Sequence, residues 1–275
     1  MESAKMAVDE GVIEAVLIGD LSDIQSIAKS MQWNLSGVKL LAAENDVDAA
    51  KQAAILAGNG EVAAIMKGHV HTDDLMRAVL SADAKLRTDR RLSHVFYMTV
   101  PGVDRPLCIT DAVINVLPSV ADKIDITKNA IGLMHALGNS DPAIALLSGT
   151  ETANASMPSS VDAAEIAALA ESGSITGARI AGPLAFDIAV SLDAANIKGF
   201  SNPVAGDADV LVVPNIESGN FLFKQMVYFM SATAAGIVLG AKVPVILTSR
   251  ADPPVARLAS AALASVANSA VMNTA

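Results

Sequence analysis

The sequence predicts an α/β protein of two domains, each with a mostly parallel sheet covered by helices. Candidate strands alternate with candidate helices along the whole chain, which is the pattern of parallel α/β folds. The strands are near-continuous runs of Val, Ile and Leu, such as residues 143–147, which indicates burial on both faces. Of the 275 residues 52% are hydrophobic and only 3% aromatic, which suits close packing of helices on sheets. We place one domain at 1–125 plus 251–275 and the other at 126–250, with a cleft between them.

In the first half, the expected elements have recognisable start and stop signals. The pattern Ser22-x-x-Gln25 indicates a capping box that opens a helix, and Gly138 indicates the end of another. The expected strands are 15–18, 38–42, 63–66, 93–100 and 107–110, and the expected helices are 22–31, 47–57, 72 onwards and 125–137.

The second half repeats the alternation around a polar loop. Residues 148–158 are rich in Ser, Thr and Asn, which is typical of a functional or mobile loop. Gly182-Pro183 is expected to form a turn, and Ser218 or Asn220 to cap a helix. The expected strands are 143–147, 178–181, 210–213, 236–239 and 243–247, and the expected helices are 162–170, one carrying Asp187, 218–230 and one at the C-terminus.

Composition and charge exclude several classes of function. A net charge of −10 argues against a nucleic-acid partner. A single cysteine, Cys108 in an apolar run, excludes an internal disulfide framework and fits a cytoplasmic protein with a small buried thiol. No apolar run approaches the ~20 residues that a membrane helix needs, no targeting segment is visible, and the four histidines lack the spacing of a zinc site.

The turn after the strand 243–247 is a candidate anion site. Asp252 before Pro253 indicates a helix start, with Asp252 as N-cap and Pro253 at the first helical position. Ser249 and Arg250 therefore stand where a strand end meets a helix N-terminus, which favours anions, and the guanidinium suits phosphate. The alternative is an ordinary turn with a surface arginine.

Residues 214–220 form a second candidate turn. Gly219 permits a ligand to approach the backbone, and Lys224 lies one turn further along the expected helix. The alternative is that Ser218 and Asn220 serve only as caps and that Lys224 is a solvated surface residue.

The chain resembles the phosphate acetyl/butyryltransferase family over nearly its whole length. The LTSRAD form at 247–252 is most similar to butyryltransferases and to the acyltransferase half of bifunctional enoyl-CoA hydratase/phosphate acetyltransferases. The start is expected to be short by roughly one helix, and whether a hydratase domain precedes the chain is left open. The motifs that carry the resemblance are Met66-Lys67-Gly68, Leu92-Ser93-His94-Val95, Ile109-Thr110-Asp111-Ala112 and residues 182–187, 204–209, 214–224 and 247–252.

The resemblance implies the fold of isocitrate and isopropylmalate dehydrogenases and a homodimer. It also implies the reaction, in which acyl-CoA and phosphate interconvert with acyl phosphate and CoA in a ternary complex. The CoA thiolate attacks the acyl phosphate, with no metal or redox cofactor. The preferred acyl chain, acetyl or butyryl, and the physiological direction stay open.

The resemblance also assigns site residues. Ser249 and Arg250 match the family's pair beside the transferring group. Family members place the thiol-deprotonating aspartate where this chain has Ala256, so the nearest carboxylate, Asp252, is the candidate base. The phosphate site comprises Ser218, Gly219, Asn220, Lys224, Gly182 and Pro183, and the CoA site comprises Lys67, Gly68, Arg77 and Asp111.

Two other functions remain as alternatives. A metal-dependent decarboxylating dehydrogenase of the same fold needs clustered aspartates and a nicotinamide site, and neither is apparent. A non-catalytic phosphate- or CoA-binding protein has no need to retain Ser249, Arg250, Asn220 and Lys224 together.

Overall fold

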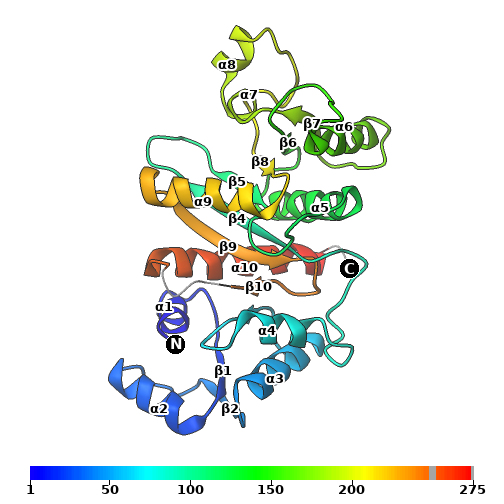
Figure 1. Ribbon diagram of the computed structural model, residues 1–275. Coiled ribbons are helices and arrows are strands. Elements are labelled where there is room, and N and C mark those ends of the chain that lie inside the picture. The colour runs from blue at the N-terminus through cyan, green and yellow to red at the C-terminus, as the bar shows by residue number, and fades with distance from the viewer. Residues whose placement is uncertain (248–251, 274–275) are drawn as a thin grey trace. The chain divides into compact units, whose positions relative to one another are not determined.

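The computed structural model describes residues 1–247 and 252–273 (Figure 1). The chain forms two compact units, one of residues 1–90 and 235–275 and the other of residues 91–234. The first unit is discontinuous, as is the first predicted domain, but its limits differ from the predicted ones. The predicted domain limits and the cleft between the domains stay predictions.

The first unit contains short parallel strands and the long C-terminal helix. Strand β1 pairs in parallel with β2, and β10 pairs in parallel with β3 and antiparallel with β9. The elements are α1 (Glu2–Asp9), β1 (Val16–Gly19), α2 (Leu21–Ser30), β2 (Lys39–Ala42), α3 (Asp46–Gly58), β3 (Ile65–Met66), α4 (Thr72–Val79), β9 (Thr233–Leu239, whose last five residues belong to this unit), β10 (Val245–Ile246) and α10 (Pro254–Asn273).

Helix α2 begins one residue earlier than predicted, and its cap is different. The side chain of Asp20 accepts hydrogen bonds from the backbone N–H groups of Ser22, at 2.8 Å, and Asp23, at 3.0 Å. Ser22 therefore lies inside the first turn, and the predicted capping box with Gln25 is wrong. An aspartate is as good a cap as a serine, so the cap lies two residues before the predicted one.

In the second unit, neighbouring strands of the sheet follow the order β4-β5-β8-β6-β7. The pairs β5–β8, β8–β6 and β6–β7 are parallel, and β4–β5 is antiparallel. The elements are β4 (Ser93–Thr99), β5 (Leu107–Thr110), α5 (Val120–Ala136), β6 (Ala143–Leu147), α6 (Pro158–Glu171), β7 (Arg179–Leu184), α7 (Phe186–Val190), α8 (Leu192–Ile197), β8 (Val210–Val212) and α9 (Ile216–Met230).

Helix packing in this unit explains why apolar strands alternating with helices predicted the sheet correctly. Helix α5 packs on β4, β5 and β8, and α6 packs on β6 and β7 (Figure 1). All five residues of β6 are buried, which matches the burial of parallel strands on both faces. The predicted mostly parallel, helix-covered sheet is confirmed for the described strands.

Several helices of this unit differ from their predicted bounds; α6, for example, begins at Pro158, four residues before the predicted start. Helix α5 begins at Val120, five residues before the predicted start, because Ser119 and Asp122 form a reciprocal capping box. Helix α8, capped by Ser191, was not predicted.

Cys108 lies in the core of the second unit and is fully buried. Burial raises the pKa of its thiol well above the usual value, and the charge of Asp209 raises it further. The thiol is therefore protonated at neutral pH, and the prediction of a small buried side chain is confirmed.

Candidate functional site

The turn after β5 is organised by the carboxylate of Asp111. Its Oδ1 accepts from the backbone N–H groups of Val113, at 2.8 Å, and Ile114, at 3.0 Å. Its Oδ2 accepts from the side-chain amide of Asn115 at 2.6 Å. Asp111 is only 2% exposed, so this carboxylate holds its own turn, residues 111–115, which we call the Asp111 turn. Its predicted contact with CoA stays a prediction.

Asn115 connects the Asp111 turn to the start of β4. Its side-chain amide also donates to the carbonyl of Leu92 at 2.9 Å, and its Oδ1 accepts from Arg91 Nε at 2.5 Å. Arg91 in turn forms an ion pair with Asp122 at 3.1 Å. Sequence reasoning missed Asn115, although a buried Asp followed four residues later by Asn was a local signal for it.

The N-terminus of α9 is capped by Asn215, so the predicted capping by Ser218 or Asn220 is wrong. The Asn215 side chain accepts from the backbone N–H of Ser218 at 2.9 Å, and the Ser218 hydroxyl bonds back to Asn215. Asn215 has the extended backbone that a cap requires, whereas Ser218 and Asn220 lie within the helix. Lys224 is exposed on the same helix, four residues after Asn220 and hence on the same face.

Gly219 packs closely against Ala112 of the Asp111 turn and against Val213. A Cβ atom there would lie 2.8 Å from Val213 Cγ2 and 2.9 Å from Ala112 Cβ. Beside it, the Asn220 side-chain amide donates to the Ala112 carbonyl at 3.3 Å. Gly219 and Asn220 therefore fasten the helix start to the turn.

Gly182 and Pro183 are residues of β7, so the predicted turn is wrong. A Cβ atom at Gly182 would lie 2.6 Å from Leu146 Cβ and 3.0 Å from the Leu146 carbonyl oxygen. The strand continues through this pair because β7 pairs with β6 as far as Leu184. The peptide bond between them is cis.

The side chain of His94, on β4, is wholly buried. Its ring contacts Phe96, with ring centroids 4.4 Å apart, and Phe96 stacks on Phe223 of α9. Burial lowers the pKa of His94 to about 4, although the charge of Asp111 opposes that shift, so the ring is neutral at pH 7. Its Nδ1 is buried and has no hydrogen-bond partner among the described residues. The stack links β4 to α9, and sequence reasoning did not find it.

The described CoA candidates of the first unit lie at the end of β3 and on α4. The Lys67 ammonium donates to the carbonyl of Val70 at 3.3 Å, and a Cβ atom at Gly68 would meet nothing within 4 Å. Arg77 forms an ion pair with Asp74 at 2.8 Å, but its side chain is 75% exposed. Such an exposed pair stabilises the fold little, so Arg77 can exchange its partner for an anion.

Ser249 and Arg250 lie outside the described residues. Asp252 is described, and helix α10 begins at Pro254, with the Pro253 carbonyl accepting from the N–H groups of Ala256 and Arg257. The helix thus begins one residue later than predicted, and the capping role of Asp252 stays a prediction.

The described residues contain neither a metal cluster nor a membrane helix. Residues 1–247 and 252–273 hold no group of three or more His, Cys, Asp or Glu side chains arranged to bind a metal ion. No helix in these ranges is long and apolar enough to span a bilayer.

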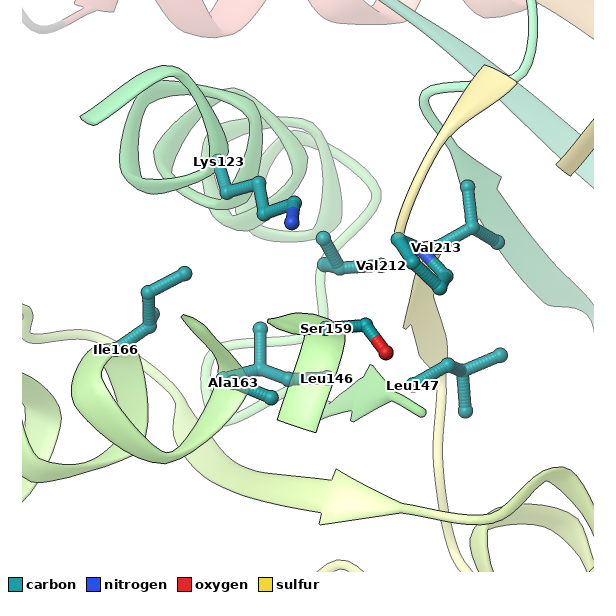
Figure 2. A pocket seen from close by; sticks show the side chains of 9 residues that line it. Lys123, Leu146, Leu147, Ser159, Ala163, Ile166, Val212 and Val213 are labelled. Carbon is teal, nitrogen blue, oxygen red and sulfur yellow. The ribbon is translucent and has the colours of Figure 1, made fainter. Parts of the chain in front are cut away.

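A recess opens at the carboxyl ends of β6 and β8, between α5 and α6 (Figure 2). It is lined mainly by apolar side chains, with Lys123 and Ser159 as its polar members. Ligands of α/β sheets bind at such strand ends. Sequence reasoning did not identify it.

Known proteins resemble this chain over most of its length. The family described as Phosphate acetyl/butaryl transferase matches residues 41–265. The phosphate acetyltransferase of Rickettsia prowazekii (strain Madrid E) is 50% identical over 263 residues, which are 95% of this chain and 75% of that protein. The phosphate butyryltransferase of Clostridium beijerinckii is 39% identical over 266 residues, which are 97% of this chain and 88% of that protein.

Solved structures also resemble this chain over most of its length. A branched-chain phosphotransacylase from Enterococcus faecalis V583 superposes with a TM-score of 0.81 at 31% identity, covering 93% of this chain and 99% of that one. A 4-hydroxythreonine-4-phosphate dehydrogenase from Klebsiella pneumoniae superposes with a TM-score of 0.52 at 13% identity, covering 92% and 88%. The second likeness concerns the fold alone, and it agrees with the dehydrogenase-like α/β fold expected from the sequence. The chain therefore belongs to the phosphate acetyl/butyryltransferase family.

Proposed function

We propose that this phosphate acyltransferase moves short acyl groups directly between CoA and phosphate, with both substrates bound at once. The observation that carries the proposal is the junction of α9 with the Asp111 turn. There Gly219 and Asn220 fasten a helix N-terminus that carries Lys224 on the same face. A helix N-terminus with an exposed lysine one turn on favours an anion of the size and charge of phosphate.

In the direction of acyl-CoA formation, the CoA thiolate attacks the carbonyl carbon of the acyl phosphate. A C–S bond forms, the bond between the acyl carbon and the bridging oxygen breaks, and phosphate leaves with that oxygen and the electron pair. In reverse, a phosphate oxygen attacks the thioester carbonyl and the CoA thiolate leaves. Both directions pass through a tetrahedral intermediate whose oxygen carries negative charge, so a fixed cation and a hydroxyl beside it lower the barrier.

We assign the stabilising groups to Ser249 and Arg250. The arginine fork can bond two oxygens at once, and the serine hydroxyl donates one more hydrogen bond. Asp252 is the base that takes the thiol proton. This role needs an ionised carboxylate near the sulfur. It can be separated from capping by Asp252→Asn, because asparagine caps a helix about as well as aspartate but is not a base.

Phosphate is held at the start of α9 by Lys224 and Asn220, next to Ser218 and Gly219, and at the end of β7 by Gly182 and Pro183. CoA is held by Lys67, Gly68 and Arg77, with Asp111 shaping the turn beside Asn220. The exposure of Arg77 and the open space at Gly68 leave room for the charged end of CoA. We propose a homodimer as the assembly.

The test is release of free thiol from acetyl-, propionyl- and butyryl-CoA with and without phosphate, in the presence and absence of EDTA. We expect thiol release that requires phosphate, forms acyl phosphate in equal amount, and persists with EDTA. If none of these three acyl-CoAs reacts with phosphate, the chain is a binding protein and the proposal is wrong.

A further inference from the structure

Three aromatic rings connect β4 to α9 within the second unit, and we call them the aromatic stack: His94, Phe96 and Phe223. His94 and Phe96 lie two residues apart on β4, so their side chains leave the same face of the strand. Their ring planes are tilted by 58°. The ring of Phe96 lies on that of Phe223 with centroids 3.7 Å apart and planes within 4° of parallel. Rings at that separation are in van der Waals contact, so a shift of one ring must move the other.

The inner end of the aromatic stack is held by the strand that carries the Asp111 turn. His94 is 1% exposed, and its backbone carbonyl accepts a hydrogen bond from the hydroxyl of Thr110 at 2.9 Å. Thr110 is the last residue of β5 and directly precedes Asp111. The first ring of the stack is therefore fixed to the same strand end as the turn that contacts the start of α9.

The outer end of the aromatic stack lies on the face of α9 that contacts the Asp111 turn. Phe223 follows Gly219 by four residues and Asn220 by three, so the three side chains share one face of the helix. Gly219 and Asn220 contact Ala112, and Phe223 contacts Phe96 one turn further along. Two contacts on one face fix the rotation of α9 about its axis, and hence the direction in which Lys224 leaves the helix.

His94 is an unusual choice for this position if its role is only to fill the core. Its buried Nδ1 has no hydrogen-bond partner among the described residues, and a buried nitrogen without a partner costs stability. Histidine has the smallest aromatic ring, so it offers Phe96 a flat surface where a larger phenylalanine ring would overpack the site. This combination indicates that the position uses the flat shape of the ring.

We propose that His94, Phe96 and Phe223 are positioning residues for phosphate, which set the rotation of α9 and thereby aim Lys224 at the phosphate group. The inference rests on the proposed function and deepens it, because it adds a support behind the phosphate site that acts through Phe223. Loss of the aromatic stack should therefore weaken the use of phosphate and leave the use of acyl-CoA unchanged.

The experiment measures initial velocities of thiol release at varied phosphate and at varied acyl-CoA. Phe223→Leu keeps an apolar side chain but removes the ring, and it should raise the phosphate KM roughly tenfold or more with the acyl-CoA KM within twofold. Phe223→Tyr retains the ring at this half-buried position and should restore the phosphate KM. Phe200→Leu is the matched control: Phe200 is also a partly buried ring packed on the core of this unit, but it lies outside the stack, so its loss should lower the melting temperature without raising the phosphate KM.

A double variant tests whether the rings act as one support. His94→Leu should also raise the phosphate KM, and combining it with Phe223→Leu should raise it no further than the larger single effect, because both changes interrupt the same contact chain. Melting temperatures identify the folded variants, and either single stack variant is sufficient. A phosphate KM within threefold of the wild type in a folded stack variant, an equal rise in Phe200→Leu, or independent effects in the double variant overturns the proposal. A wild type that uses no acyl-CoA is a different result, which removes the proposed function itself.

Discussion

Gly219 lies where α9 meets the Asp111 turn, and replacing it with alanine should impair phosphate use while the protein still folds. The added Cβ would lie 2.8 Å from Val213 Cγ2, 2.9 Å from Ala112 Cβ and 3.1 Å from Ala112 Cα. Ordinary carbon contacts are about 3.5–4.0 Å, so the helix must move away by roughly 0.6–0.7 Å. That movement also stretches the Asn220 hydrogen bond to Ala112, which is already 3.3 Å long.

The magnitude follows from two opposing terms. Overpacking costs about 1–3 kcal/mol, and replacing glycine by alanine in a helix recovers about 1 kcal/mol. The melting temperature should therefore fall by no more than roughly 8 °C. A misplacement of about 1 Å can cost ~10²-fold in rate, so a shift of more than half that size should lower kcat/KM for phosphate roughly tenfold or more.

Gly132→Ala is the matched control. Gly132 lies within α5, and a Cβ there would meet nothing within 4 Å, so the variant should be stabilised by about 0.5–1 kcal/mol with unchanged activity. The assay is initial velocity of thiol release at varied phosphate, together with thermal unfolding of both variants. A Gly219→Ala enzyme with wild-type kcat/KM for phosphate would refute the reasoning, because the junction would then not position the phosphate group.

Four further predictions concern single side chains. Arg250→Ala should lower kcat roughly 10²–10³-fold, with partial recovery in Arg250→Lys, and near-normal kcat would remove Arg250 from the reaction. Asp252→Asn should lower kcat by roughly 10²–10⁴-fold, with partial recovery as pH rises toward the thiol pKa of about 8.5; wild-type kcat would show that it is not the base. Lys224→Ala should raise the phosphate KM with little change in the CoA KM, and an unchanged phosphate KM would exclude Lys224 from the site. The pKa of His94 is lowered to about 4 in the folded protein, so stability is full above about pH 6.5, the unfolded value, and is lost as pH falls toward 4. His94→Leu should flatten this dependence in urea unfolding, and an unaltered pH profile would contradict the buried neutral ring.

The fold was predictable where the signal is local or strictly periodic. Strand β6 was predicted with its observed bounds, because five consecutive apolar residues between turn signals fit only a fully buried short strand or a very short helix. Helix starts were less predictable. Asp20 and Asn215 form the actual caps of α2 and α9, and each stands next to other residues that can cap equally well.

The limits of the two compact units depend on pairing between strands that are far apart in the sequence. Strands β4 and β5 belong to the second unit because β5 pairs with β8, about a hundred residues later in the chain. Sequence proximity instead placed them in the first predicted domain.

The site shows the same division between local and distant contacts. The bonds from Asp111 to its own turn span at most four residues and had a local signal. The contact of Ala112 with Gly219 and Asn220 joins segments more than a hundred residues apart, and the recess depends on the register that sets Leu146 beside Val212. Neither register nor helix placement is specified by residue pattern alone, so the recess could be found only in the folded chain.

The most direct test of the account is isotope exchange, because the central claim is direct transfer with both substrates bound. The purified protein is incubated with acyl phosphate and labelled inorganic phosphate, once without CoA and once with a catalytic amount of CoA. The account predicts label in the acyl phosphate only when CoA is present, since the acyl group leaves phosphate for CoA and not for the protein. Exchange without CoA at a rate close to turnover would reveal a covalent acyl-protein intermediate and contradict the account.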